Sequence, residues 1–294
     1  MIKRNMAIVA AALALGAVGV PAGAQDFGAA AQPFQVGKLQ VTTLHDKQNL
    51  MPNDGKVIGV DVGPAAVSKV LASKGKPTDK LLLSVDALAI KTGKGYGLID
   101  TGLGPKAKGS LPESMALAHI SPASVTDVLI THSHGDHIGG LVNADGGYAF
   151  PNAKVRMSAK EWTELQGRQG SEDVVKAIGS HVVTFTPGKA ILPGITPVAL
   201  YGHTQGSVGY LIVSGKSSLM DIGDTAHSSV ISLERPEWRI KYDENSPEAI
   251  GVRKATLKKL AAGHTLVFAP HFPYPGVGRI AKDGVGYQWK PSLR

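Results

Sequence analysis

The sequence of 294 residues contains no cysteine. Disulfides and thiolate metal sites are therefore excluded, so any bound metal ion must be held by histidine and carboxylate side chains. Donors of this kind favour zinc, manganese, iron or cobalt. A chain of this length can bury a sizeable core without covalent cross-links.

Long apolar runs are also scarce, and the clearest one lies close to the start of the sequence. Basic residues at positions 3 and 4 precede an apolar stretch over residues 6–20, and small residues follow up to Ala24. This order predicts a secretory signal peptide, residues 1–24, cleaved after Ala24. A membrane anchor is the alternative, but the stretch is shorter than the roughly 20 residues of a spanning helix. We therefore expect a periplasmic or secreted protein without stable membrane insertion.

The sequence also lacks a basic stripe. The formal net charge is +8, but lysine and arginine are scattered along the chain, and aromatic residues make up only 5% of it. Nucleic-acid binding proteins concentrate their basic residues on one face or along one helix. We therefore expect a small-molecule substrate and no nucleic acid. The oligomeric state stays open, with a homodimer as one option.

The pattern of the chain predicts one α/β domain behind a short lead. Residues 25–36 are rich in Ala, Gly and Gln without periodicity and are interpreted as a flexible N-terminal segment, so the domain is expected over residues 37–294. No fixed repeat and no long linker divides it. Short apolar runs predict strands at 39–44, 81–91, 96–100, 125–131, 154–158, 182–186, 195–201, 208–213, 217–222 and 265–269.

Helical patterns alternate with these strands. The best defined is expected over residues 247–262, with Ser246 as N-cap, Pro247 at the first position and Gly263 just past the end. Shorter helices are expected at 64–73, 112–118, 159–166 and 172–179. The alternation indicates helices packed outside β-sheets.

The densest chemical signal follows the strand-like run that ends at Thr131. His132, His134, Asp136 and His137 lie within six residues in a glycine-containing turn. Imidazole nitrogens and a carboxylate oxygen are the ligands that a hydrolytic metal ion takes. A histidine-rich surface loop, or core histidines bonded to the backbone, is the alternative, but the spacing after a buried strand argues against it. The turn therefore predicts a metal site.

Three further candidate ligands lie at the ends of other strand-like runs. His203 stands in a Gly-His-Thr-Gln-Gly-Ser turn, Asp224 follows an apolar run and a glycine, and His271 follows a run that ends in Ala-Pro. Strand ends can bring residues from distant parts of a chain to one edge of a sheet. We therefore expect these side chains to complete the site.

In this order, the His-x-His-x-Asp-His signature, the Gly-His-Thr-x-Gly-Ser turn and the Gly-Asp turn resemble the metallo-β-lactamase superfamily. The resemblance covers nearly the whole predicted mature chain. It implies an α/β fold, the αβ/βα sandwich of two mixed β-sheets flanked by helices, with the active site along one edge. It also implies two divalent metal ions, with zinc favoured over manganese, iron or cobalt.

The resemblance assigns a role to each candidate ligand. One metal ion would be held by His132, His134 and His203, the other by Asp136, His137 and His271, with Asp224 and a hydroxide bridging the two. The hydroxide would act as nucleophile, so Asp136 and Asp224 would serve catalysis as well as metal binding. Asp100 resembles the aspartate that supports the histidine-rich turn from behind. A simple turn-forming role for Asp100 before Gly102 is the alternative.

The end of the chain narrows the expected activity. Residues 270–278 and 284–289 resemble the end of the methyl parathion hydrolase group, whose relatives include phosphotriesterases and lactonases. That group uses the bridging aspartate, which true class B β-lactamases lack. Asp224 therefore argues against penicillin-type substrates. The resemblance implies hydrolysis of a lactone, an ester or an organophosphate triester.

Four further residues are predicted to contact the substrate. His227 stands where lactonases of the family often have a tyrosine, and we expect it to hydrogen-bond the substrate or protonate the leaving alcohol. A histidine that faces solvent or caps a helix is the alternative. Trp162, Phe272 and Tyr274 are expected to form an apolar wall of the substrate pocket, although each would also suit the core.

Other activities stay open on the sequence, because this fold serves many reactions. A class B-like β-lactamase is one, and a glyoxalase-like thioesterase or a sulfur dioxygenase with a single iron is another. A non-catalytic metal-binding protein is the alternative from a different class. A storage site, however, has no need of a bridged pair of ions with open positions.

Overall fold

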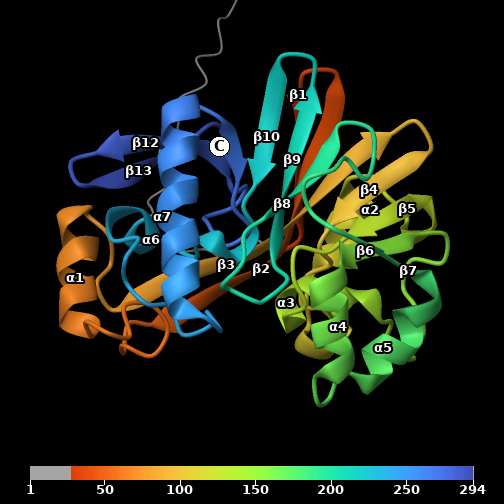
Figure 1. Ribbon diagram of the computed structural model, residues 1–294, viewed down its shortest axis with the longest axis horizontal. Helices are drawn as coiled ribbons and strands as arrows, with labels where there is room; N and C mark the ends of the chain where they lie inside the picture. Colours follow the sequence, from red (N-terminus) through yellow and green to blue (C-terminus); the bar gives the residue numbers. More distant parts are fainter. Residues whose placement is uncertain (1–27, 294) are drawn as a thin grey trace, which may run out of the picture.

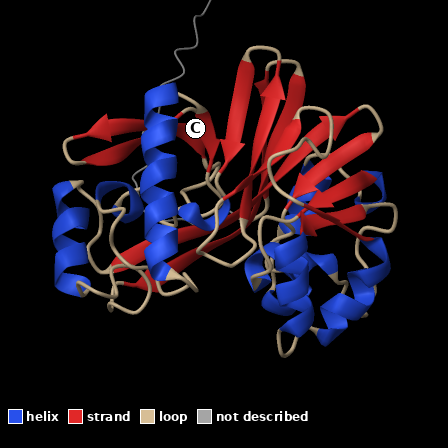
Figure 2. Cartoon of the chain, in the orientation of Figure 1, coloured by secondary structure: helices blue, strands red, loops and turns tan. Residues whose placement is uncertain are grey.

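The computed structural model describes residues 28–293, so the predicted signal peptide over residues 1–24 lies outside the described part. Two β-sheets stand in the middle of the molecule, with helices on both outer sides (Figure 1, Figure 2). One sheet has the strand order β1-β2-β3-β4-β5-β6-β7, and the other has the order β13-β12-β11-β10-β9-β8. The predicted αβ/βα sandwich is confirmed.

The seven-stranded sheet is antiparallel from β1 to β4 and parallel from β4 to β7. Its longest strands, β2 and β3, extend as one antiparallel pair toward the side of the molecule where α1 (Pro64–Ser73), which lies between them in the sequence, is found (Figure 1). The strands are β1 (Ala30–Val36), β2 (Leu39–Pro52), β3 (Lys80–Thr92), β4 (Gly95–Ile99), β5 (Val125–Leu129), β6 (Lys154–Ser158) and β7 (Val182–Phe185).

Strand β1 overturns part of the prediction for the N-terminal segment. Residues 30–36 are not a flexible lead; they pair with β2 in register from Ala30 opposite His45 to Val36 opposite Leu39. Gly37 takes a positive φ of 59° in the two-residue turn between the strands, a conformation that suits a tight hairpin. The segment lacks apolar alternation, so pairing with β2 stabilises it rather than its own composition.

The six-stranded sheet contains one parallel pair, β10 with β11, and is otherwise antiparallel. Its last hairpin, β12 with β13, was not among the predicted strands. The strands are β8 (Ile195–Ala199), β9 (Val208–Ser214), β10 (Ser217–Asp221), β11 (Leu266–Phe268), β12 (Val277–Asp283) and β13 (Gly286–Pro291).

Apolar side chains fill the space between the sheets and beneath the helices. Leu88 and Leu129 from one sheet and Tyr210 from the other belong to the same fully buried cluster. The helices that cover the seven-stranded sheet are α2 (Leu111–Leu117), α4 (Ala159–Gly167) and α5 (Glu172–Ile178). Helix α7 (Ser246–Gly263) covers the other sheet through Leu257 and Leu260. This packing fixes the strand ends on which the candidate ligands stand.

The ends of α7 differ from the prediction by one residue each. Asn245, and not Ser246, is the N-cap: its side chain accepts a hydrogen bond from the backbone N–H of Glu248, and its Nδ2 donates to the Glu248 carboxylate. The first of these bonds satisfies a free backbone N–H at the helix start, and the second holds the two side chains together. At the other end Gly263 is still helical, and His264 takes the left-handed conformation with a φ of 49°. Within residues 28–293, no helix has the length and apolar character needed to cross a bilayer.

Candidate metal centre

The seven predicted ligands stand on loops that follow strands of both sheets. The turn with His132 and His134 follows β5 and continues into α3 (Gly135–Ile138). His203 lies between β8 and β9, Asp224 in a short 3-10 helix after β10, and His271 after β11. The residues that end β5, β10 and β11 are buried, so these strands position their loops from the core. The structure brings all seven side chains to one place between the two sheets.

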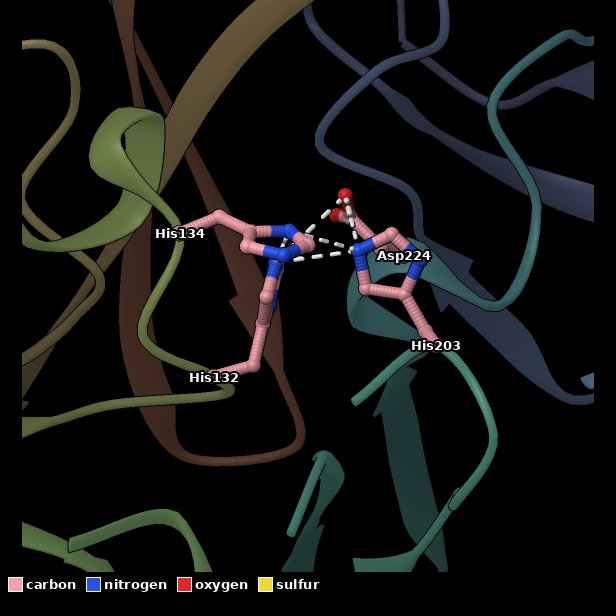
Figure 3. A group of neighbouring side chains, drawn as sticks. All are labelled: His132, His134, His203 and Asp224. Atoms are coloured by element: carbon pink, nitrogen blue, oxygen red, sulfur yellow. Dashed lines mark hydrogen bonds and ion pairs between the residues drawn. The ribbon is translucent and has the colours of Figure 1, made fainter. Parts of the chain in front are cut away.

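The first cluster consists of His132, His134, His203 and Asp224, whose ligand atoms all lie within 4.8 Å of one another. Figure 3 shows the three imidazole rings turned toward a common point beside the carboxylate. Nδ1 of His134 lies 3.1 Å from Nε2 of His132 and 3.0 Å from Nε2 of His203. The two Nε2 atoms lie 3.2 Å apart. Ring nitrogens so close together can share one cation.

The second cluster contains Asp136, His137 and His271. Oδ1 of Asp224 lies 3.1 Å from Nε2 of both histidines. Its other oxygen, Oδ2, lies 3.2 Å from Nε2 of His203 in the first cluster and 3.1 Å from Nε2 of His271. The carboxylate of Asp224 is therefore in contact with both groups of ligands, as a bridging aspartate requires.

The donor set fits divalent ions such as zinc. Nitrogen ligands 2.0–2.1 Å from a tetrahedral zinc lie about 3.3 Å apart, and the nitrogens of the first cluster are 3.0 to 3.2 Å apart. Nε2 of His137 and Oδ1 of Asp224 are buried without a hydrogen-bond partner in the described part of the chain. Unpaired buried polar atoms are rare in folded proteins, and two such atoms 3.1 Å apart indicate a cation that both could bind.

Asp100 supports the histidine-rich turn, in the position predicted for it. Its Oδ2 lies 2.7 Å from Nδ1 of His137, and its Oδ1 accepts a hydrogen bond from the backbone N–H of Thr131. The hydroxyl of Thr131 also contacts Asp100, at 2.7 Å, and lies 3.1 Å from Nδ1 of His132. Occupying Nδ1 in this way leaves Nε2 of both rings free for a metal ion.

The other two Nε2 ligands have partners that the sequence did not reveal. Nδ1 of His203 lies 3.1 Å from Oδ1 of Asp243, and the second oxygen of Asp243 accepts a 2.6 Å hydrogen bond from the buried Arg253. Nδ1 of His271 lies 2.6 Å from the carbonyl oxygen of Ser84. Asp243 sits in a loop without a motif, and Ser84 acts through its backbone, so no local pattern marks either residue.

Electrostatics keep two imidazoles of the first cluster in the neutral form that binds metal ions. Burial, with the neighbouring histidines, lowers the pKa of His132 well below its usual value. Burial and the adjacent His203 lower the pKa of His134 to about 4. At neutral pH both rings therefore present a lone pair instead of a proton.

The carboxylate between the clusters stays ionised. Burial alone would raise the pKa of Asp224, but the surrounding histidines, led by His271, hold it well below its usual value. The same charge acts on His203: burial lowers its pKa, yet Asp224 and Asp243 outweigh burial and raise it to about 9. A metal ion must therefore displace a proton from His203, which makes metal binding dependent on pH.

A cavity of about 340 Å³ opens onto the clusters and contains His134, Asp136, Asp224 and His271 in its wall. His227 also lines it, so the interpretation as a solvent-facing histidine is wrong: the residue is 2% exposed. Its ring stacks on His271 with 5.0 Å between the ring centres. Its Nε2 lies 3.1 Å from Oδ2 of Asp224, so His227, Asp224 and His271 form a third group of potential ligands.

The predicted aromatic wall lies elsewhere. Phe272 is fully buried and packs edge-on against Trp289, Trp162 packs on the core beneath α4, and Tyr274 lies over His45. None of the three lines this cavity: Phe272 and Trp162 belong to apolar clusters, and the hydroxyl of Tyr274 lies 3.5 Å from the carbonyl oxygen of Thr43. The apolar wall comes instead from the paired strands β2 and β3, which contribute Met51, Leu83 and Val85. Asn49 and Tyr242 complete the cavity.

Two sheets with flanking helices, and clusters of histidine and aspartate at the strand ends, define a metal-dependent hydrolase. Residues 82–271, more than half of the chain, match the family model described as the metallo-beta-lactamase superfamily. The chain therefore belongs to the metallo-beta-lactamase superfamily.

Solved structures and a curated relative show what the chain is similar to. The structure of AidC, described as a dizinc quorum-quenching lactonase with a product bound, is 25% identical, with a TM-score of 0.86 over 90% of this chain and 98% of that one. A structure described as the hydrolase AbOPH is 26% identical, with a TM-score of 0.81 over 91% of this chain and 98% of the other. Metallo-beta-lactamase type 2 from Bacillus cereus is 28% identical over 76% of this chain and 86% of its own. The chain spans 42% and 61% of the length of two other curated relatives.

Proposed function

We propose that this chain is a dinuclear metal-dependent hydrolase that opens lactones, with activity toward esters and organophosphate triesters as well. The observation that carries the proposal is the carboxylate of Asp224, which presents Oδ1 to His137 and His271 and Oδ2 to His203. Such a carboxylate joins two metal sites into one centre. Similarity to a dizinc lactonase over 90% of the chain supports the substrate class.

Two divalent ions would be held by His132, His134 and His203 on one side and by Asp136, His137 and His271 on the other, with Asp224 shared. When bound, they would supply a nucleophile from water at neutral pH and an electrophile for the carbonyl or phosphoryl oxygen. Asp100, Asp243 and the carbonyl oxygen of Ser84 hold the Nδ1 atoms of three ligand rings and so fix the orientation of these rings. The rings are those of His137, His203 and His271.

The cavity provides the substrate with one polar and one apolar side. Asp136, Asp224 and His227 lie on the polar side, and Met51, Leu83 and Val85 lie on the β2–β3 side. A lactone ring would face the charged groups, while its acyl or aryl substituent would lie against the apolar wall.

His227 is proposed to contact the substrate. Its Nδ1 is buried without a hydrogen-bond partner in the described residues, and burial lowers the pKa of the ring, so the imidazole is neutral at pH 7. We propose that its N–H hydrogen-bonds the substrate; to protonate the leaving alcohol, the neutral ring would first take up the proton released by the attacking water. A His227→Ala variant with full lactonase turnover from pH 6 to pH 9 would refute this role.

The test of the proposed function is a hydrolysis screen with purified, metal-loaded protein. It covers N-acyl homoserine lactones, simple lactones, aryl esters, a paraoxon-type triester and nitrocefin, and metal content is measured on the same samples. Lactone turnover that His134→Ala abolishes is the expected result. Equal turnover in wild type and His134→Ala would refute the site, and a single iron per chain would favour a dioxygenase.

A β-lactamase is the second candidate function, because a Bacillus cereus relative of that description matches 76% of this chain. The bridging position of Asp224 argues against it, and nitrocefin hydrolysis distinguishes the two. Export to the periplasm or the medium also remains a proposal, which rests on the order of residues 1–24. Mass spectrometry of the secreted or periplasmic protein tests it: a chain that begins at Gln25 is expected.

A further inference from the structure

Glu161, in the first turn of α4, is a fully buried carboxylate with three hydrogen-bond partners. Its Oε1 accepts from the backbone N–H and from the hydroxyl of Ser133, each at 2.6 Å. Its Oε2 accepts from the hydroxyl of Thr204, also at 2.6 Å. In all three short contacts the carboxylate oxygens act as acceptors.

The partners of Glu161 belong to the two turns that carry the first cluster. Ser133 lies between His132 and His134, and Thr204 follows His203. One carboxylate therefore ties together the two turns whose three imidazoles converge. The hydrogen bonds of Glu161 go to Ser133 and Thr204 only, so none of them joins it directly to the second cluster.

Helix α4 is itself fixed against both turns. The hydroxyl of Ser158, its N-cap, donates to the carbonyl oxygen of Gly206, and a Cβ on Gly206 would lie 2.3 Å from the backbone nitrogen of Glu161. At the other end of the helix, Arg168 donates a 2.6 Å hydrogen bond to the carbonyl oxygen of Ser133. Ser133 is thus held through its N–H at one end of α4 and through its C=O at the other.

The charge of Glu161 has no cationic partner at ion-pair distance within residues 28–293. A carboxylate buried among neutral donors is costly unless something offsets its charge. Cations bound by the neighbouring histidines would supply that offset. A purely structural cross-link between two turns could be made by a neutral side chain, so a carboxylate here indicates a role toward bound cations.

We propose that Glu161 is a positioning residue for the metal ion held by His132, His134 and His203: it fixes the distance between the two ligand turns and adds a negative charge behind them. The inference rests on the metal centre proposed above. It predicts that loss of Glu161 weakens one of the two metal sites and leaves the other nearly unchanged.

The test is a titration of metal-free protein with Zn²⁺ against a chromophoric chelator, which reports the affinity and number of sites without using turnover. Glu161→Ala should weaken one site by about 10- to 100-fold, the range found when a ligand loses its supporting partner. Glu161→Gln keeps the size of the side chain but loses the charge, and Thr204→Val removes only the link to the His203 turn. Each is expected to weaken the same site by a smaller factor.

The double variant Glu161→Ala with Thr204→Val separates positioning from general destabilisation. If Thr204 acts through Glu161, the second substitution adds no further loss of Zn²⁺ affinity. Asp127→Asn is the matched control, because Asp127, on β5, is also a buried carboxylate with a side-chain partner, Arg156, but contacts neither turn. It should keep both affinities even where it lowers the melting temperature.

The outcomes distinguish this inference from the proposed function. If wild-type protein binds fewer than two Zn²⁺ ions, the dinuclear centre itself is refuted. If wild type binds two ions and the Gln and Val variants bind both with wild-type affinity, the role of Glu161 is refuted and the centre stands. These two conservative variants decide the question even if Glu161→Ala does not fold.

Discussion

Oδ1 of Asp224 lies 3.1 Å from Nε2 of His137, while the other oxygen of the same carboxylate faces His203 at 3.2 Å. Both oxygens therefore lie against imidazole nitrogens, and Oδ2 also lies 3.1 Å from Nε2 of His271. This arrangement has no evident purpose in a protein without metal ions, because it places one carboxylate among several buried imidazoles. Loss of this carboxylate should therefore affect both metal sites.

Asp224→Ala should reduce the metal content from two ions to at most one per chain and lower kcat for a lactone by more than about 100-fold, because the shared ligand is lost. Metal analysis and steady-state kinetics on the same preparation check it. Asp145→Ala, a change of an exposed aspartate, is the control and should keep both quantities at wild-type values. Two tightly bound ions in Asp224→Ala would contradict the bridging role.

Asp243 gives the second prediction, since it links His203 to the buried Arg253. Asp243→Asn should lower metal affinity by about 10- to 100-fold, because the ring loses its charged partner. Asp243→Ala should also lower the free energy of unfolding, by about 3–5 kcal/mol, because a buried guanidinium loses its counter-charge. Chelator competition and urea denaturation measure the two effects. Wild-type metal affinity in Asp243→Asn would show that the backbone alone orients His203.

The sequence predicted the ligands well and their supports poorly, for a physical reason. His132 to His137 form a contiguous pattern, and His203, Asp224 and His271 follow apolar runs whose ends meet in this class of fold. Asp100 was predicted from its resemblance to the family aspartate that supports the histidine-rich turn, and not from a local pattern. The structure gathers all these side chains, as expected from strand ends. Their binding of metal ions stays a prediction.

Contacts that depend on tertiary packing could not be predicted from a local sequence pattern. Glu161 lies three residues after Ser158, a spacing typical of a helix N-terminus in which the glutamate turns back to the N-cap; here it reaches Ser133 and Thr204 instead. Phe272 follows a ligand in the sequence, but β11 turns it into the core. Strand β1 forms because β2 offers a partner. Each of these depends on a distant segment that a local pattern does not contain.

The apolar wall of the cavity gives the third prediction. Met51 lies on β2 and lines the cavity beside Leu83 and Val85. Met51→Ser should raise KM about 3- to 10-fold for a lactone with an apolar acyl chain and leave kcat nearly unchanged, because it removes contact that ground state and transition state share. Kinetics with short- and long-chain lactones check it. Leu117→Ser, an exposed site on α2, is the control; equal KM values for Met51→Ser and wild type would place the acyl chain elsewhere.

Asp221 gives the last prediction, on stability in the absence of metal. Its side chain is buried: Oδ1 accepts a 2.9 Å hydrogen bond from the N–H of Gly223, and Oδ2 has no partner in the described residues. Burial, followed by the charge of Asp100, raises the pKa of Asp221 from 3.8 to about 8. Between these values the folded protein holds a proton that the unfolded chain has released. The contribution of this group to stability is therefore complete below about pH 4 and is lost as the pH rises toward 8.

Asp221→Asn removes this titration while its amide oxygen can still accept from Gly223. In chelator-treated protein, the wild type should therefore lose more unfolding free energy between pH 5 and pH 8 than the variant does. Urea denaturation at several pH values measures the free energy of unfolding of both proteins. Both contain the same histidines, so the effect of histidine titration cancels when the two values are subtracted. Asp145→Asn is the control for loss of a carboxylate as such. If wild type and Asp221→Asn show parallel pH profiles, Asp221 is ionised in the folded protein, and its unpaired oxygen then requires a cation or a water beside it.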